Sequence, residues 1–335
     1  MTAPVALVTG AGGFLGSHLV ERLLADGYAV RAFCQYDSTG SPGWLADADL
    51  NCDTGANERG GRLEIHLGDV RDARCVRRVA DGVDVVFHLA ALIAIPYSYQ
   101  APASFVDTNV TGTLNVLEAV RDAGVPRLVH TSTSEVYGTP ESVPIRETHR
   151  LCGQSPYSAS KIAADQLCEA YARSFHTPVV TLRPFNTYGP RQSARAVIPT
   201  LLGQLLTGAA KVRLGSLTPC RDFTYVTDTV DGFVRMAEAD LAPGTLVQLG
   251  TGRSVSVAEL LAACCVVAGH AAEPVCDAER LRPAASEVQI LRSDPARAAR
   301  LLGWTPTVEL EDGLRRTAAW LGSRTDPRTA ARYQR

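Results

Sequence analysis

Three glycines, Gly10, Gly13 and Gly16, constrain the fold of this chain more than any other feature. They lie between an apolar run, Val5–Thr9, and a segment starting at Phe14 whose apolar residues recur with helical spacing. Since glycine has no Cβ, the backbone can approach a pyrophosphate here, and the start of the following helix favours its negative charge. The strand-turn-helix context predicts a dinucleotide-binding βαβ unit, with a tight turn that binds nothing as the alternative.

The first half of the chain alternates short β-rich runs with helical periodicity, which is typical of a parallel sheet covered on both faces. We therefore expect a doubly wound α/β domain of the Rossmann type, with its ligand at the carboxyl ends of the strands. Residues 36–61 interrupt the alternation and should form a long surface loop. The expected strands are Val5–Thr9, Ala29–Cys34, Leu63–Leu67, Val83–Leu89, Arg127–Ser132 and Val179–Arg183, and the expected helices are Phe14–Asp26, Asp72–Ala80, Ala101–Ala123 and Tyr157–Phe175.

The second half is less regular and is expected to add a smaller C-terminal substrate-binding lobe. Helical segments at Pro199–Thr207, Val257–Ala268 and Pro295–Leu302 are separated by loops marked by Pro and Gly. We expect the dinucleotide-binding domain to span 1–183 and to include part of 223–250. The lobe should consist of 184–222 and 251–323, and residues 324–335 should form a flexible tail.

Composition excludes several classes of function. The net charge is -2 and the basic residues are scattered, so nothing in the sequence attracts nucleic acid or an anionic membrane. No apolar run is long enough to span a bilayer and no secretion signal is recognisable, which predicts a cytoplasmic protein. The nine cysteines include no Cys-x-x-Cys pair, so we expect buried free thiols and no metal site.

Residues after the second and third strands indicate which dinucleotide the chain binds and how it is held. Cys34 stands where an acid would usually hold the ribose hydroxyls, and Asp37 follows three residues later. No Lys or Arg occurs between Arg31 and Arg59, so a 2′-phosphate would find little positive charge, which favours NAD and leaves NADP open. Asp69 follows the third strand and could accept a hydrogen bond from the adenine amine or cap the next helix.

Tyr157 and Lys161 are four residues apart on an expected helix, so both side chains lie on one face. A free tyrosine has a pKa of about 10, and a neighbouring ammonium together with an oxidised nicotinamide would lower it. The pair can then take a proton from an alcohol while hydride leaves the carbon. Tyr-x-x-x-Lys is common by chance, but here it follows a nucleotide turn and the Ser/Thr-rich strand end Ser132–Glu135.

At these residues the sequence resembles the extended short-chain dehydrogenase/reductase family along nearly its whole length, and within it the nucleotide-sugar 4,6-dehydratases. The matching segments are the glycine turn, Asp69–Val70, His88–Ala91, Asn109–Thr113, Ser132–Glu135, Tyr157–Lys161 and Arg183–Pro190. Three further segments resemble the subgroup that acts on nucleotide-linked N-acetylglucosamine in legionaminic-acid-type pathways. These are Ile93–Tyr99, Gln192–Pro199 and Gly215–Pro219.

The resemblance implies a role for each catalytic residue. Thr133 would bind the C4 hydroxyl, and Tyr157 with Lys161 would remove its proton. Glu135 would take the C5 proton of the resulting ketone, water would leave from C6, and hydride would return to C6. Where dTDP-glucose dehydratases have Asp, this chain has Ser134, as GDP-mannose dehydratases do, and Ser134 could relay a proton from Glu135 to the departing hydroxyl. From the residues alone, the alternative for Glu135 is a surface carboxylate at a strand end, and the alternative for Thr133 is ordinary β-propensity.

The same resemblance implies the binding residues. For the cofactor they are Gly10, Gly13, Phe14, Leu15, Gly16, Asp69, Val70, Leu89, Ala90, Ala91, Tyr157, Lys161 and Pro184; for the nucleotide sugar, with UDP favoured, they are Asn186, Arg195, Val197, Arg221 and Arg282. Arginine suits a diphosphate because its planar fork binds phosphate oxygens in pairs. A salt bridge with Asp222 or another acid is the alternative for Arg221. A homodimer through the helices expected at Ala101–Ala123 and Tyr157–Phe175 is also implied.

Three rivals share these features. A UDP-glucuronate decarboxylase would need a cation at the sugar carboxylate. A nucleotide-sugar 4-epimerase would leave Glu135 without a role. A dinucleotide sensor without turnover would not need the Tyr157 and Lys161 pair.

Overall fold

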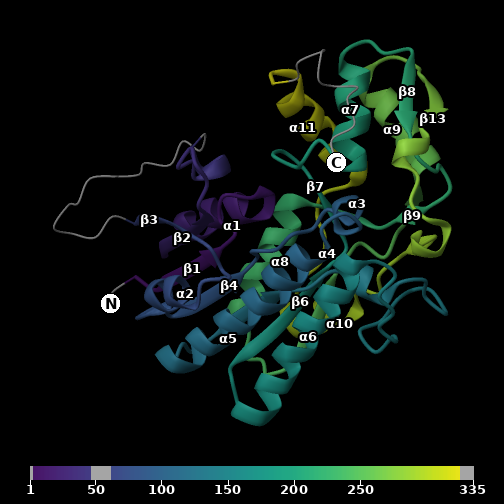
Figure 1. The fold of residues 1–335 in the computed structure, drawn as a ribbon. Helices are drawn as coiled ribbons and strands as arrows, with labels where there is room; N and C mark the ends of the chain where they lie inside the picture. The colour runs from purple at the N-terminus through teal and green to yellow at the C-terminus, as the bar shows by residue number, and fades with distance from the viewer. Residues whose placement is uncertain (1–2, 47–61, 325–335) are drawn as a thin grey trace.

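A computed structural model describes residues 3–46 and 62–324. Its centre is a seven-stranded parallel sheet with strand order β11-β6-β5-β4-β1-β2-β3 (Figure 1). The strands are β1 (Val5–Thr9), β2 (Ala29–Gln35), β3 (Leu63–Gly68), β4 (Val85–His88), β5 (Leu128–Thr131), β6 (Val179–Pro184) and β11 (Leu246–Leu249). The predicted doubly wound α/β fold is therefore confirmed.

Successive residues of the sheet strands point to opposite faces, and each face packs against its own helices. In β1, Leu7 belongs to a buried cluster with residues of α2, α5 and α6, whereas Ala6 and Val8 belong to the larger core with α1 and α8. Figure 1 shows α5 and α6 together on one side of the sheet. The helices are α1 (Phe14–Ala25), α2 (Ala73–Ala80), α3 (Ile95–Ser98), α4 (Pro102–Phe105), α5 (Gly112–Ala123), α6 (Pro156–Phe175) and α8 (Val226–Glu238).

Residues after β6 add small sheets and helices beside the carboxyl end of the main sheet. Helices α9 and α11 pack on α7 and on each other. The helices are α7 (Val197–Leu206), α9 (Val257–Ala268), α10 (Ala296–Leu302) and α11 (Leu310–Gly322); the strands are β7 (Asn186–Tyr188) with β10 (Phe223–Tyr225), β8 (Lys211–Leu214) with β13 (Glu273–Cys276), and β9 (Cys220–Arg221) with β12 (Val255–Ser256) and β14 (Ile290–Leu291).

Six predicted strands are present within two residues of their expected bounds, but several other expectations differ. The helix expected at Ala101–Ala123 contains a π-helical segment, Val106–Thr111, between α4 and α5. The loop expected at 36–61 contains a 3-10 turn, Gly43–Ala46, that buries Leu45, and the rest of that prediction falls on residues 47–61, outside the described residues. The helices α8 and α11 were not expected.

The lobe boundaries and the flexible tail stay predictions. Strand β11 pairs with β6 in the main sheet, and all but the first residue of the predicted tail lies outside the described residues. Within 3–46 and 62–324, no helix combines the length and the apolar character needed to cross a membrane.

Candidate active site

A cavity of about 1650 Å³ opens at the carboxyl ends of the sheet strands. It brings together residues from both ends of the chain. The predicted site residues that line it are Gly10, Gly13, Phe14, Leu15, Gly16, Asp69, Val70, Leu89, Ala90, Ala91, Thr133, Glu135, Tyr157, Lys161, Pro184, Asn186, Arg195, Val197, Arg221 and Arg282. Ser134 is 3% exposed and is not among the lining residues, and the proton relay suggested for it stays a prediction.

The glycine turn is built for close backbone approach to an anion. Gly10 has φ +72, and a Cβ there would lie 2.8 Å from the amide nitrogen of Ala90 on the neighbouring strand connection. Gly13 is the N-cap of α1 and provides no side-chain hydrogen bond, so the first backbone N–H groups of the helix have no side-chain cap. These residues line the cavity, which fits a dinucleotide pyrophosphate at the helix N-terminus.

Asp69 does not cap the next helix, which was one of its two expected roles. Its carboxylate accepts hydrogen bonds from the backbone N–H and guanidinium of Arg71, the latter at 2.5 Å, whereas the N-cap of α2 is Asp72. Asp69 still lines the cavity, so the adenine contact stays a prediction. Asp37 is held in its own turn, where it accepts from the backbone and hydroxyl of Thr39. Cys34 is buried, as expected of the thiols, but Cys152 and Cys276 are exposed, so that expectation is wrong for these two.

The predicted catalytic residues come from two segments that meet over β5. Thr133 is the N-cap of a 3-10 turn, Ser134–Tyr137, and accepts a hydrogen bond from the backbone N–H of Glu135 at 3.2 Å. Tyr157 lies in the first turn of α6, which begins with a capping box at Ser155. All of these lie at one end of the sheet, so the local turn geometry places the carboxylate and the phenol in the same cavity.

Burial raises the pKa of the Tyr157 phenol, a nearby Thr133 hydroxyl lowers it, and the charges of Glu135 and Asp165 raise it further. The expected help from Lys161 is not seen. Its ammonium donates a hydrogen bond to the backbone oxygen of Thr131 at 2.7 Å, and burial lowers the pKa of the ammonium itself. The Tyr157 phenol can therefore act as a base only when a bound group, such as an oxidised nicotinamide, brings positive charge into the cavity.

A buried polar network that the sequence did not reveal lies behind Lys161. Asp165, one turn further along α6, accepts hydrogen bonds from Ser132 Oγ at 2.6 Å, Arg183 at 2.7 Å and His130 Nε2 at 3.2 Å. Burial alone would raise the pKa of the Asp165 carboxyl, but the hydrogen bond with His130 and the charge of Arg183 hold it well below its usual range. This fixed negative charge also opposes the loss of the Lys161 proton.

We expect Asp165→Asn to destabilise the protein by about 2 kcal/mol at pH 7, because a buried charged acceptor is lost while its donors remain. The depressed pKa means that this stability is present above the pKa of an unfolded Asp, about 3.9, and is lost as pH falls through the folded pKa. The gap between wild type and variant should therefore shrink below about pH 4 in urea unfolding. Asp231→Asn, at a surface ion pair with Arg22 and Arg235, is the control and should cost less than about 1 kcal/mol. Equal losses in both variants would contradict the role of Asp165.

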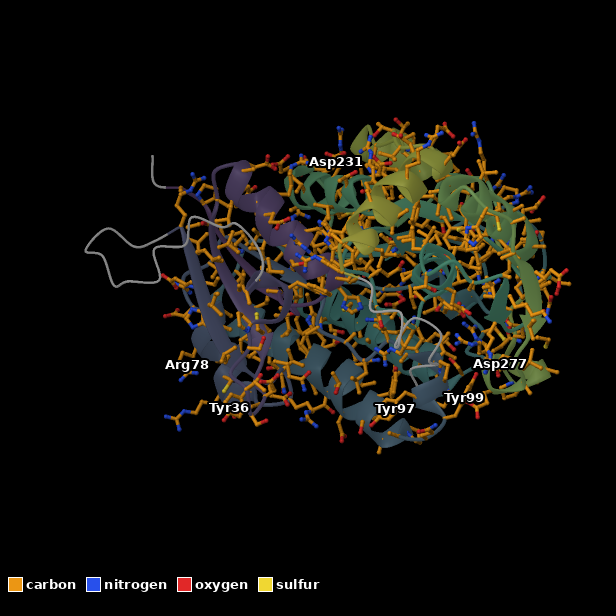
Figure 2. All side chains as sticks on the ribbon, turned by 90° about the horizontal axis from the view of Figure 1, so that it is seen from above. Tyr36, Arg78, Tyr97, Tyr99, Asp231 and Asp277 are labelled. Carbon is orange, nitrogen blue, oxygen red and sulfur yellow. The ribbon has the colours of Figure 1, made fainter. Side chains whose placement is uncertain are left out.

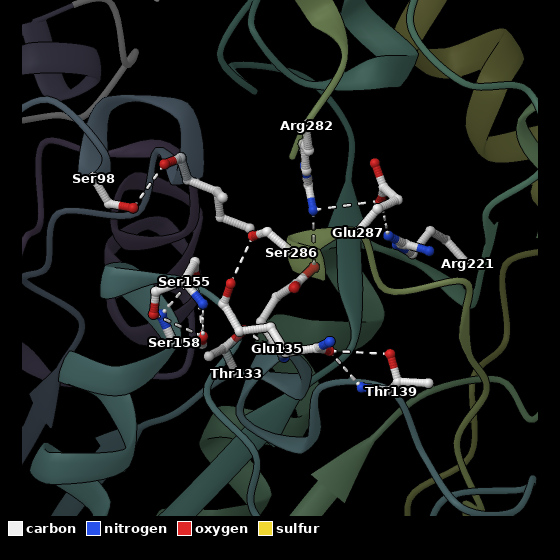
Figure 3. Close-up of polar contacts among 12 residues, drawn as sticks. Ser98, Thr133, Glu135, Thr139, Ser155, Ser158, Arg221, Arg282, Ser286 and Glu287 are labelled. Atoms are coloured by element: carbon white, nitrogen blue, oxygen red, sulfur yellow. Dashed lines mark hydrogen bonds and ion pairs between the residues drawn. The ribbon is translucent and has the colours of Figure 1, made fainter. Parts of the chain in front are cut away.

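Charged side chains form a chain across the substrate side of the cavity (Figure 3). Arg221 donates to Glu287 Oε1 at 3.2 Å, and Arg282 Nη1 lies 3.7 Å from that oxygen and 4.0 Å from Glu135 Oε1. The alternative for Arg221, a salt bridge with an acid of this chain, is therefore present, with Glu287 as its partner. Asp222 is not that acid, since it accepts hydrogen bonds from residues 251, 252 and 293 instead. Glu287 was missed, and its only sequence signal was its closeness to Arg282.

The remaining predicted substrate residues lie in the same cavity. The Oδ1 atom of Asn186 is buried and, within the described residues, has no hydrogen-bond partner. This is expected of an acceptor that forms its hydrogen bond with a bound ligand. The Nε of Arg195 is 3.2 Å from Ser193 Oγ. In the segment Ile93–Tyr99, Tyr97 and Tyr99 are each 38% exposed and lie at the surface, where Figure 2 labels them, while also lining the cavity.

Known proteins that are similar in sequence and fold indicate the family to which this chain belongs. A UDP-glucose 4-epimerase of Mycolicibacterium smegmatis is 35% identical over 324 residues, which cover 95% of this chain and 99% of the relative. The solved dTDP-glucose 4,6-dehydratase DesIV of Streptomyces venezuelae, with NAD bound, matches at TM-score 0.83 and 32% identity over 96% of this chain and 97% of that one. TunA, an NAD-dependent NDP-hexosamine 5,6-dehydratase of tunicamycin biosynthesis, matches at TM-score 0.79 and 30% identity over 96% and 98%.

The family model described as GDP-mannose 4,6 dehydratase matches residues 7–317. The relatives include both dehydratases and an epimerase, and none of them marks the N-acetylglucosamine subgroup of the legionaminic-acid-type pathways. A match over nearly the whole chain, with its glycine turn and its Tyr157 and Lys161 pair in one cavity, means that the protein belongs to the GDP-mannose 4,6-dehydratase family of nucleotide-sugar dehydratases and epimerases.

Proposed function

We propose that the protein is a nucleotide-sugar 4,6-dehydratase that converts a nucleotide-linked N-acetylglucosamine, with UDP favoured, to the 4-keto-6-deoxy sugar. The observation that carries this proposal is the position of Glu135. Its carboxylate lines the same cavity as Tyr157, close enough to raise the phenol's pKa by its charge. A second base beside the oxidising pair is needed for elimination and for nothing that a simple dehydrogenase does.

Each of these residues then has a defined role in the reaction. Thr133 and Tyr157 hold the C4 hydroxyl, and Tyr157 takes its proton. Bound NAD would supply a hydride acceptor for C4 and afterwards the hydride for C6. Glu135 removes the C5 proton, which the C4 ketone has made acidic, and water leaves from C6. Because Ser134 is buried and is not among the residues that line the cavity, we assign the return of the proton to the leaving hydroxyl to Glu135 itself.

NAD is the cofactor that these residues fit. The described residues 32–46 hold no Lys or Arg. Arg71, which follows β3 and lines the cavity, is already paired with Asp69. A 2′-phosphate would therefore have to compete with Asp69 for Arg71. The solved relatives DesIV and TunA, both NAD proteins, support the same choice.

One rival gains support from the structure. Arg282 lies 4.0 Å from Glu135, and a UDP-glucuronate decarboxylase needs a cation beside the sugar carboxylate. Arg282 is therefore available either to the diphosphate or to an acidic C6 group. A 4-epimerase is supported by the Mycolicibacterium smegmatis relative but gives Glu135 no role. A sensor without turnover would not need Tyr157 or Lys161 in the cavity.

Incubation of the NAD-loaded protein with four substrates tests the proposal: UDP-N-acetylglucosamine, UDP-glucuronate, GDP-mannose and dTDP-glucose. We expect loss of one water from UDP-N-acetylglucosamine, detected by mass spectrometry, with a ketone at C4. Loss of CO₂ from UDP-glucuronate would instead establish the decarboxylase. A 4-epimer of unchanged mass would establish the epimerase, and an alkene without a C4 ketone would indicate 5,6-dehydration.

The homodimer and the cytoplasmic location stay predictions. Val106, the first residue of the π-helical segment before α5, is 51% exposed, and Phe175, the last residue of α6, is 50% exposed. Apolar side chains left at the surface of these two helices are consistent with a partner subunit there.

A further inference from the structure

The segment after β2 packs directly on the glycine turn. The backbone N–H of Trp44 donates a hydrogen bond to the oxygen of Gly12 at 3.0 Å. A Cβ on Gly12 would collide with the oxygen of Pro42, and one on Gly43, which has φ +65, would collide with the oxygen of Gly12. The two backbones therefore touch without side chains between them, and this contact fixes Trp44 beside the residues that approach the pyrophosphate.

A second tryptophan reaches the same place from the other end of the chain. Trp320 lies near the end of α11, and its ring packs edge to face on Trp44, with centroids 5.5 Å apart and an interplanar angle of 69°. The guanidinium of Arg324 lies 5.1 Å from the Trp320 ring. The start of α11 is fixed elsewhere, because Tyr188 Oη donates to the oxygen of Leu310 at 3.1 Å.

The packing of the core does not explain this pair. Both rings are only partly buried, and both line the cavity that contains Gly10 and Gly13. Trp304 shows the contrast, since it is 1% exposed and its indole N–H donates to the oxygen of Asp228 at 2.8 Å. Trp44 and Trp320 therefore join two distant parts of the chain across the wall of the cofactor cavity.

We propose that Trp44 and Trp320 form a clasp that closes the cavity over the pyrophosphate of bound NAD and sets the rate at which NAD leaves. The inference rests on the NAD site of the proposed function, and not on the identity of the sugar. A cofactor that is regenerated in every turnover has no need to dissociate, so a contact that delays its release keeps the enzyme loaded. An edge-to-face aromatic pair is strong enough to change the opening equilibrium by roughly 3- to 10-fold.

The rate of cofactor release tests the clasp. The protein is stripped of nucleotide, reloaded with NADH, and mixed with excess NAD while the fluorescence of bound NADH is followed. We expect Trp44→Leu and Trp320→Leu to release NADH roughly 3- to 10-fold faster than wild type, because leucine keeps apolar surface but loses the ring contact. Trp320→Phe, which keeps an aromatic ring, should lie between them and wild type.

The double variant Trp44→Leu/Trp320→Leu should release NADH no faster than the faster single variant, since each ring acts through the other. Val266→Ala, a 71% exposed position on α9, is the control and should match wild type. Unchanged release in both single variants, or two effects that multiply in the double variant, would overturn the clasp. A wild-type protein that binds no NADH would instead overturn the proposed cofactor site itself.

Discussion

Tyr157→Phe is expected to lose about 10²-fold or more of the turnover rate while it binds NAD as well as the wild type does. Phenylalanine keeps the ring, whose edge-to-face contact with Phe105 has centroids 6.2 Å apart, and removes only the hydroxyl that takes the C4 proton. The glycine turn at Gly10 is untouched. The turnover rate is measured on UDP-N-acetylglucosamine, and NAD binding is measured by titration of the stripped protein.

Tyr171→Phe is the matched control because Tyr171 lies on the same helix, α6, with its hydroxyl hydrogen-bonded to Glu118 rather than in the cavity. It should keep wild-type activity. Near-normal activity in Tyr157→Phe would remove this phenol as the base. Equal losses in both variants would point to a general effect on the helix.

The catalytic base also illustrates what a sequence can and cannot show about charge. The spacing of Tyr157 and Lys161 placed both residues in one cavity, but it could not show that Lys161 would donate to the oxygen of Thr131. Nor could it show Asp165 beneath them, because His130, Ser132 and Arg183 reach that carboxylate only when β5, β6 and α6 pack together. Local spacing predicts which side chains share a face, whereas a buried network depends on tertiary contacts.

The same limit applies to the fold. Strand and turn chemistry predicted the sheet well, because apolar β-rich runs and Gly10 act locally. The π-helical segment Val106–Thr111 was not predictable from periodicity, since it changes the helical register without changing composition. The segment Gly43–Ala46 looked like loop sequence, yet it packs on Gly12 and meets Trp320 from the far end of the chain.

Arg221 and Arg282 show a related gap at the substrate side. Their residue type predicted an anion site, and both line the cavity. Their actual neighbours are carboxylates of this chain, with Glu287 between them. Nothing in the sequence indicates that the two arginines share an acid, because Arg221 comes next to the segment that follows Arg282 only when β9 pairs with β14.

Glu135→Gln is expected to oxidise C4 but to form product about 10²- to 10⁴-fold more slowly, because the amide cannot take the C5 proton. Hydride transfer from C4 needs Tyr157 and NAD, and neither is changed. Reduced nicotinamide should therefore accumulate with sugar bound, and its absorbance measures this directly. In heavy water, wild-type product should carry deuterium at C5, and sugar recovered from the variant should not.

Glu287→Gln is the matched control, since it removes the same charge from the same chain of side chains, on the other side of Arg282. The affinity for substrate should change in this variant. Reduced nicotinamide should not accumulate, because Glu135 remains to take the C5 proton. If Glu135→Gln instead releases 4-keto-6-deoxy sugar at the wild-type rate with deuterium at C5, Glu135 is not the base. The carboxylate would then be only a partner of Arg282, and the proposal of a dehydratase over an epimerase would lose the observation that carries it.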